Sequence, residues 1–167
     1  MEVANELDDL AHKIGADEEL FEELDKRYFV VEQLGKGNER EVAKFEEGQI
    51  FFCNDFYAQL VSHSSDGRSL VRATTAHEMI HIREKDKPSL FPYRQRKVET
   101  RCDREAVKYV PSEDLIAALE IKDQVVEERR LPKVPRYKSG RHPLLEQRKR
   151  NIRRAEKEQA EKGFAKD

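Results

Sequence analysis

The chain has 167 residues, of which 40% are charged and 37% hydrophobic, and this suits one domain with a modest core. The net charge of −2 hides an uneven distribution. Residues 1–26 hold ten acidic and two basic side chains, a balance of −8, whereas residues 131–167 hold five acidic and twelve basic ones, a balance of +7. The sequence has no run of the roughly 18 apolar residues that a membrane span needs, no signal-peptide layout at its acidic start, and too few cysteines for a disulfide framework. We therefore expect a cytoplasmic protein without a membrane partner.

The first third of the chain predicts one helix and a small sheet. Apolar residues on one helix face predict a helix over residues 3–14. Residues 28–34, 41–45 and 49–54 are rich in aromatic and β-branched side chains and predict three short strands. The links between the strands resemble hairpin turns, so we expect a mainly antiparallel sheet. The polar residues 62–69 predict a loop.

Two stronger helix candidates follow. Residues 70–83 carry apolar side chains around most of the helix circumference, which is typical of a buried central helix. Residues 94–110 carry an apolar stripe through Cys102 and Ala106, which would pack this second helix against the first. A third helix is expected from Ser112, a residue suited to the N-cap.

The composition changes after residue 120. Residues 121–142 include the proline-rich segment LPKVPRYKSGRHP and predict a linker, and residues 143–167 predict a basic, charged helical tail. We therefore expect an α+β domain over residues 1–120, with an N-terminal helix, a three-stranded mainly antiparallel sheet and two packed helices. The run RKRNIRRAEK at 148–157 could make nonspecific, salt-dependent contact with nucleic acid. The alternatives are a solvated helix face or a strap over the acidic N-terminal region.

Residues 74–84 read TTAHEMIHIRE and contain the motif H-E-x-x-H, formed by His77, Glu78 and His81. Residues four apart on a helix differ by about 40° in direction, so the two imidazoles can bind one metal ion. Glu78 lies about 100° round from His77, beside the metal, where it can act as the general base on a water whose pKa zinc lowers to about 7. The motif therefore predicts a catalytic zinc site, and two histidines with ordinary hydrogen-bond partners are the alternative.

A catalytic zinc site generally has three protein ligands and one open position. The segment VETRCDREA offers Glu99 and Asp103, which are also four residues apart. Glu99 could be the third ligand, and Asp103 could accept a hydrogen bond from the far nitrogen of a zinc-binding histidine and so hold its tautomer. The alternative is a pair of surface acids neighbouring Arg96, Arg101 and Arg104.

Other reactive residues have less defined roles. Cys53 and Cys102 are soft ligands in principle, but they lie on apolar stripes and are expected in the core. Four side chains remain open as candidates to stabilise the oxyanion of a hydrolytic reaction: His63, Tyr57, Tyr93 and Tyr109.

The combination of motifs resembles the ImmA/IrrE family of metallopeptidase-like proteins. The matching segments are IFFCN ending at Asn54, TTAHEMIH, and ETRCDREAVKYVP from Glu99 to Pro111. The resemblance covers roughly residues 1–120. The family commonly has glycine just before the second histidine of H-E-x-x-H, where this chain has Ile80, a difference that affects packing and not ligation.

The resemblance implies a zincin-like fold and a gluzincin-type site. On the matching positions, the zinc ligands are His77, His81 and Glu99, the general base is Glu78, and Asp103 supports a ligand histidine. It also implies a protein often encoded on phages or mobile elements that cleaves or antagonises a helix-turn-helix repressor.

Two functional hypotheses follow. The first is a zinc metalloendopeptidase that cleaves a regulatory protein, in particular a helix-turn-helix repressor, and so relieves repression. The alternative is a non-catalytic zinc-binding regulator that acts by docking on a repressor or on nucleic acid.

Overall fold

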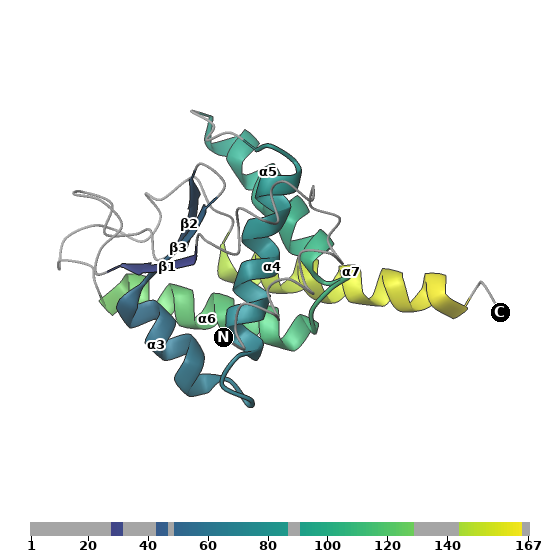
Figure 1. The fold of residues 1–167 in the computed structure, drawn as a ribbon. Helices are drawn as coiled ribbons and strands as arrows, with labels where there is room; N and C mark the ends of the chain where they lie inside the picture. The colour runs from purple at the N-terminus through teal and green to yellow at the C-terminus, as the bar shows by residue number, and fades with distance from the viewer. Residues whose placement is uncertain (1–27, 32–42, 47–48, 87–90, 129–143, 165–167) are drawn as a thin grey trace.

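The computed structural model describes residues 28–31, 43–46, 49–86, 91–128 and 144–164. The strands are β1 (Tyr28–Val31), β2 (Ala43–Glu46) and β3 (Gln49–Cys53). The helices are α3 (Asn54–His63), α4 (Ser69–Arg83), α5 (Pro92–Ala106), α6 (Ser112–Glu128) and α7 (Leu145–Phe164). The helices have 10 to 20 residues and the strands only 4 or 5, so the described part of the chain is mostly helical (Figure 1).

The strand arrangement corrects the prediction of an α+β domain built on a mainly antiparallel sheet. Helices dominate the described residues, and the small sheet has the order β1-β3-β2 with one parallel pairing, β1 with β3. Only β2 and β3, joined through residues 47–48, pair antiparallel as a hairpin. The prediction was wrong because it treated both links as tight turns. The eleven residues 32–42 are too many for a tight turn, and β2 lies on the far side of β3 from β1.

Two further differences concern helices. The helix predicted over residues 3–14 lies outside the described residues. Helix α3 was not predicted, because its sequence follows a strand directly and was not tested for helical spacing. The signal was present in Phe56 and Leu60, which are four residues apart on one helix face and are both fully buried.

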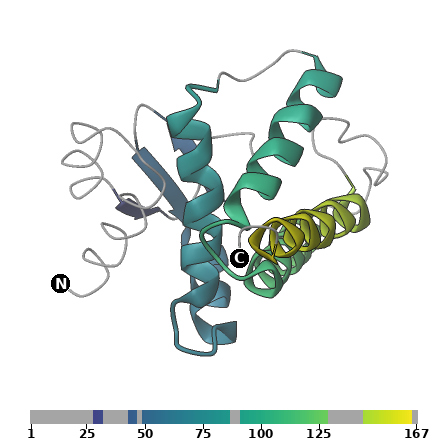
Figure 2. The same cartoon turned by 90° about the vertical axis from the view of Figure 1, so that its right-hand side faces the viewer.

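Helix α4 lies at the centre of the molecule, as its all-round apolar pattern predicted. It contacts β2, α3, α5 and α6, and thirteen of its fifteen residues are buried (Figures 1 and 2). A polar side chain on α4 is therefore removed from water whichever way it points. Such a side chain has to find a polar partner or a ligand, because burying an unpaired polar group is costly.

Helices α5, α6 and α7 cover one side of α4. Helix α5 packs on α4, and its residues Cys102 and Ala106 are fully buried, as the apolar stripe predicted. Helix α7 contacts both α5 and α6 (Figure 2), and its residues Ile152 and Ala155 are in the core or beside it. The charged C-terminal helix is thus packed against α5 and α6. The prediction of a linker over residues 121–142 is corrected in part, because residues 121–128 continue α6 as its last two turns, whereas residues 129–142 lie outside the described residues. None of the helices that the structure describes has the length and apolar character needed to cross a membrane.

Candidate metal centre

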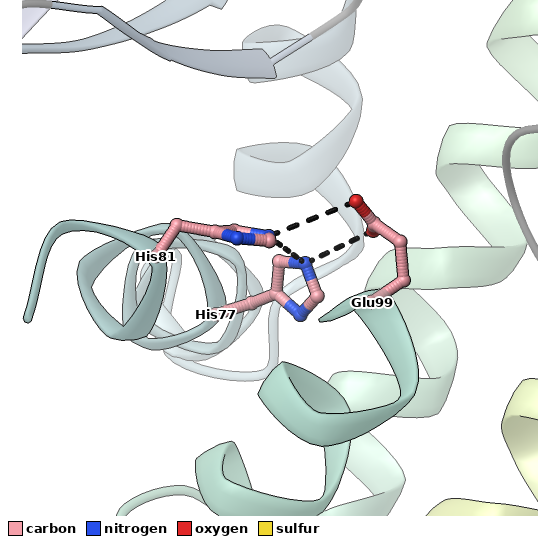
Figure 3. Close-up of side chains that lie close together, drawn as sticks. All are labelled: His77, His81 and Glu99. Carbon is pink, nitrogen blue, oxygen red and sulfur yellow. Dashed lines mark hydrogen bonds and ion pairs between the residues drawn. The ribbon is translucent and has the colours of Figure 1, made fainter. Parts of the chain in front are cut away.

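Three side chains of α4 and α5 converge on one point. The Nε2 atoms of His77 and His81 are 3.2 Å apart, and the Glu99 carboxylate oxygens lie 3.4 Å from the first and 3.8 Å from the second (Figure 3). A zinc ion bound tetrahedrally at about 2.0–2.1 Å separates its ligand atoms by about 3.3–3.4 Å. The three donor atoms therefore have the spacing of a metal site, and the three residues form a group that could hold a metal ion.

The carboxylates that face the two imidazoles also favour a cation at this point. The Nδ1 atom of each ring faces a carboxylate, that of Asp103 for His77 and that of Asp86 for His81, both at 3.0 Å. When each Nδ1 carries a proton toward its carboxylate, both Nε2 atoms present lone pairs to each other and to the carboxylate of Glu99. Three electron-rich atoms in a buried space repel one another unless a proton or a metal ion lies between them.

Behind His77 lies a pair that we call the inner support, Asp103 and Arg148. The side chain of Asp103 is fully buried, and its two oxygens accept hydrogen bonds from Nε and Nη2 of Arg148, at 2.7 and 2.6 Å. Oδ1 of Asp103 also lies 3.0 Å from Nδ1 of His77, in a bent contact. Arg148 comes from α7, 45 residues further along the chain, and is only 5% exposed.

The charges of the inner support shape the titration of the site. Burial alone would raise the pKa of Asp103, but Arg148 and His77 together hold it down, at about 2. Burial alone would lower the pKa of His77, but the carboxylates of Asp103 and Glu99 raise it to about 9. A proton and a metal ion therefore compete for His77.

Behind His81 lies a second pair, the outer support, Asp86 and Arg101. Helix α4 ends in a Schellman motif: the N–H of Lys85 bonds to the carbonyl of Ile82, and the N–H of Asp86 bonds to the carbonyl of His81. Lys85 adopts the left-handed conformation, with φ 52°, that this motif requires. The turn brings the carboxylate of Asp86 back onto Nδ1 of His81, and Nη2 of Arg101 binds Oδ1 of Asp86 at 2.6 Å.

The thiol of Cys102 touches the outer support without forming a better ligand set. Its Sγ lies 3.4 Å from Nδ1 of His81, so His81, Asp86 and Cys102 make a second group with metal-ligand chemistry. Burial and the carboxylates of Asp86 and Glu99 raise the pKa of this thiol, which keeps it protonated, whereas metals bind the thiolate. The group around Nε2 is therefore the better candidate site.

Glu99 and Asp103 are not the surface acids of the alternative interpretation. Glu99 is 4% exposed and Asp103 is fully buried. The neighbouring Arg101 and Arg104 form ion pairs with other carboxylates. Gln95, one turn before Glu99, donates a hydrogen bond of 2.9 Å to its Oε1 and so helps to orient the carboxylate.

Glu78 is 6% exposed and follows His77 on α4. Within the described parts of the chain, the carboxylate of Glu78 forms no side-chain hydrogen bond or ion pair. Among the residues that the structure describes, the charged side chains at the site are four carboxylates and two guanidinium groups: Glu78, Asp86, Glu99 and Asp103, with Arg101 and Arg148. Their formal charges sum to −4 + 2 = −2 when the histidines are neutral, so one divalent cation balances the site.

The four candidates for oxyanion stabilisation are spread over the molecule. His63 hydrogen-bonds within α3, and Tyr109 accepts a hydrogen bond from an arginine of α4. Tyr93 projects from the start of α5 and is 60% exposed, whereas Tyr57 packs edge-on against Phe52. This role stays a prediction for all four residues. The two cysteines are buried, as expected for core positions, and are not joined in a disulfide.

Arg148 is a site residue that the sequence pattern did not predict, because it lies in the basic run at 148–157, where a solvated helix face or a surface contact was expected. The structure divides that run: Arg148, Ile152 and Ala155 are buried, and Lys149 forms an ion pair of 2.5 Å with Glu120. A signal existed, since positions 148, 152 and 155 are spaced i, i+4, i+7 on one helix face. An arginine on the buried face of a helix needs an acidic partner. Contact of this run with nucleic acid stays a prediction.

Comparison of the chain with protein-family models, with curated proteins and with solved structures finds no match. The residues of the H-E-x-x-H and E-x-x-x-D motifs nevertheless lie together in one buried, negatively charged centre.

Proposed function

We propose that the chain is a zinc-dependent endopeptidase that cleaves a regulatory protein. The observation that carries this proposal is the convergence of two imidazole nitrogens and one carboxylate within 3.2–3.8 Å, with the buried Glu78 directly following His77 on α4. Two histidines and one glutamate leave a fourth position open on a tetrahedral zinc ion, and such an open position is typical of catalytic zinc sites.

In this proposal, each residue of the site has a defined role in peptide hydrolysis. A bound zinc ion would supply a Lewis acid and lower the pKa of the attacking water. Glu78 would take a proton from this water while the water oxygen forms a bond to the carbonyl carbon of the substrate. Glu78 would then give the proton to the amide nitrogen as the C–N bond breaks. His77, His81 and Glu99 would hold the ion, and Asp103 and Asp86 would keep the two imidazoles in the tautomer whose Nε2 can bind it.

The substrate class that we propose is a helix-turn-helix repressor in the cytoplasm, cut at one or a few positions. The support for this class is the resemblance of the motifs to those of the ImmA/IrrE proteins, combined with a site in which all the expected side chains are present. In the alternative hypothesis, the protein docks on a repressor without cutting it. The presence of Glu78, a buried residue that directly follows His77 in α4, favours the enzyme, because a docking protein has no use for a general base at this position.

Metal content is the first test. We expect about one zinc per chain by mass spectrometry of gently purified protein, and loss of that zinc in His77→Ala and Glu99→Ala. The control is His63→Ala, which removes an exposed histidine outside the group and should keep the zinc. Zinc retained at full occupancy in Glu99→Ala would move the third ligand elsewhere, and a wild-type protein that binds no zinc would overturn the proposal.

Cleavage is the second test. Wild-type protein would be incubated with a library of proteome-derived peptides and with candidate helix-turn-helix repressors, and new N-termini would be identified by mass spectrometry. Glu78→Gln should lose about 10²- to 10⁴-fold in rate while it keeps its zinc, and the exposed Glu156→Gln should behave as wild type. If Glu78→Gln still relieved repression in cells at the wild-type level, the docking hypothesis would replace the enzyme.

A further inference from the structure

Helix α7 contributes one buried charge to the candidate metal centre. Arg148 is 5% exposed although it is an arginine near the start of a helix that is otherwise rich in exposed charges. Its side chain reaches between α5 and α7 to the carboxylate of Asp103, and its Nη2 also lies 3.8 Å from Oε2 of Glu99. The guanidinium group thus lies close to Glu99, a proposed metal ligand. It is also hydrogen-bonded to Asp103, which faces the second proposed ligand, His77.

The contact between Arg148 and Asp103 uses two parallel hydrogen bonds, from Nε to Oδ2 and from Nη2 to Oδ1. Such a fork fixes both the position and the plane of a carboxylate, which a single hydrogen bond does not. Oδ1 of Asp103 is the same atom that lies 3.0 Å from Nδ1 of His77. Arg148 therefore fixes the position of the same carboxylate oxygen that faces the His77 ring, and in this way it affects the orientation of the ring.

The orientation of that ring decides whether a metal can bind. Nε2 of His77 has to point at the space shared with His81 and Glu99, and it lies 3.2 and 3.4 Å from their ligand atoms. A carboxylate free to rotate would let the imidazole turn about its own side-chain bonds and spoil this geometry. Groups that orient the ligands of a metal site typically change metal affinity 10- to 100-fold when they are removed.

We propose that Arg148 is a positioning residue of the metal centre, so that the docking of the C-terminal helix α7 and the binding of metal are coupled. The inference rests on the metal site of the proposed function and does not require peptide cleavage. It assigns the last helix a part in forming the centre, although both sequence motifs lie in α4 and α5.

The molecule offers a matched control for the docking of α7. Arg104 of α5 and Glu158 of α7 form an ion pair of 2.6 Å between the same two helices. That pair is at the surface, with the side chain of Arg104 46% exposed, and it touches no residue of the ligand group. Removal of Arg104 tests the attachment of α7 alone, whereas removal of Arg148 tests attachment and positioning together.

The experiment uses the full chain and three variants, Arg148→Met, Arg148→Lys and Arg104→Met. The zinc dissociation constant is measured by competition with a chromogenic chelator, and the geometry of the site is measured from the visible absorption bands of bound Co²⁺. We expect zinc affinity about 10- to 100-fold lower and altered Co²⁺ bands in Arg148→Met. Arg148→Lys should recover part of both, because lysine restores the charge but not the fork, and Arg104→Met should match wild type.

A second comparison keeps the inference testable if Arg148→Met does not fold. The double variant Asp103→Asn/Arg148→Met has no unpaired charge at this position, and Asp103→Asn is its reference. If Arg148 acts through Asp103, the loss of Arg148 adds little to the effect of Asp103→Asn on zinc affinity. A further tenfold loss in the double variant would show a different route and overturn the inference.

The outcomes separate this inference from the proposed function. Wild-type zinc affinity and unchanged Co²⁺ bands in Arg148→Met would overturn the positioning role and leave the proposed metal centre intact. A wild-type protein that binds neither zinc nor Co²⁺ would overturn the metal centre and, with it, the role of Arg148.

Discussion

The inner and outer supports hold the two histidines of the candidate metal centre in the same chemical way and in different surroundings. Each consists of an aspartate facing Nδ1 of a histidine and an arginine bonded to that aspartate. The arginine of the inner support is 5% exposed, whereas the side chain of Arg101 in the outer support is 42% exposed. Water can replace part of the outer support but none of the inner one.

The supports also differ in how they are assembled. The outer support is local, since Asp86 follows His81 by five residues and is brought back by the end of the same helix. The inner support joins residues 45 positions apart and exists only when α7 is docked. We infer that the outer support makes a small, local contribution to the orientation of His81. The inner support makes the geometry of the site depend on the stability of the whole fold.

The largest expected difference between the supports is in folding stability. Arg148→Met leaves the carboxylate of Asp103 buried without its partner and should cost about 3–5 kcal/mol in the free energy of unfolding. Arg101→Met removes a partly exposed pair and should cost no more than about 1 kcal/mol. Urea unfolding followed by circular dichroism measures both, and similar losses in the two variants would contradict the distinction between the supports.

The next effect concerns metal affinity. Asp103→Asn should weaken zinc binding toward the upper end of the 10- to 100-fold range, because both oxygens of Asp103 face donors and the amide nitrogen of asparagine would meet a donor of Arg148 or His77 in that buried position. Asp86→Asn should fall toward the lower end, because Asp86 is only half-buried and water can replace part of its contact with His81. Chelator competition compares the two variants. A larger loss for Asp86→Asn would reverse the roles that we assign to the supports.

The pH dependence of stability gives a third contrast, for protein freed of metal with a chelator. The lowered pKa of Asp103, about 2 against an ordinary 3.8, adds stability above about pH 4 that disappears as the pH falls through 2. The raised pKa of His77, about 9 against 6.5, adds stability below about pH 6.5 that disappears as the pH rises through 9. Relative to Asp103→Asn/Arg148→Met, wild type should therefore be favoured most between about pH 4 and 6.5. A pH-independent difference in unfolding free energy would contradict this assignment.

The smallest effect concerns the turn that forms the outer support. Lys85 has φ 52°, and glycine adopts this conformation at lower cost than lysine does. Lys85→Gly should raise the free energy of unfolding by about 0.5–1 kcal/mol and leave zinc affinity unchanged, with Lys85→Ala as the neutral control. A loss of stability on the change to glycine would mean that the Lys85 side chain itself holds the turn together.

The sequence predicted the parts of the site that depend on one helix at a time. The spacing of His77 and His81, and of Glu99 and Asp103, places each pair on one helix face, and the structure brings the first three of these residues together. Asp86 was missed because the residue that reverses the chain before it is a lysine, where glycine would have signalled a helix end. The parallel pairing of β1 was missed because a linear pattern carries no record of which strand lies between two others.

The sequence by itself determined a buried central helix with two histidines and a glutamate, and a second helix with an i, i+4 acidic pair, because helix geometry and apolar spacing are local properties. Only the tertiary structure decided that Arg148 belongs to the same centre. In the sequence, Arg148 is one of many charged residues in a basic run. Its side chain becomes buried only because α7 packs against its neighbours, and the run itself does not indicate this packing. The physical reason is that a buried ion pair requires both partners to leave water together, which happens only when α7 packs against α5.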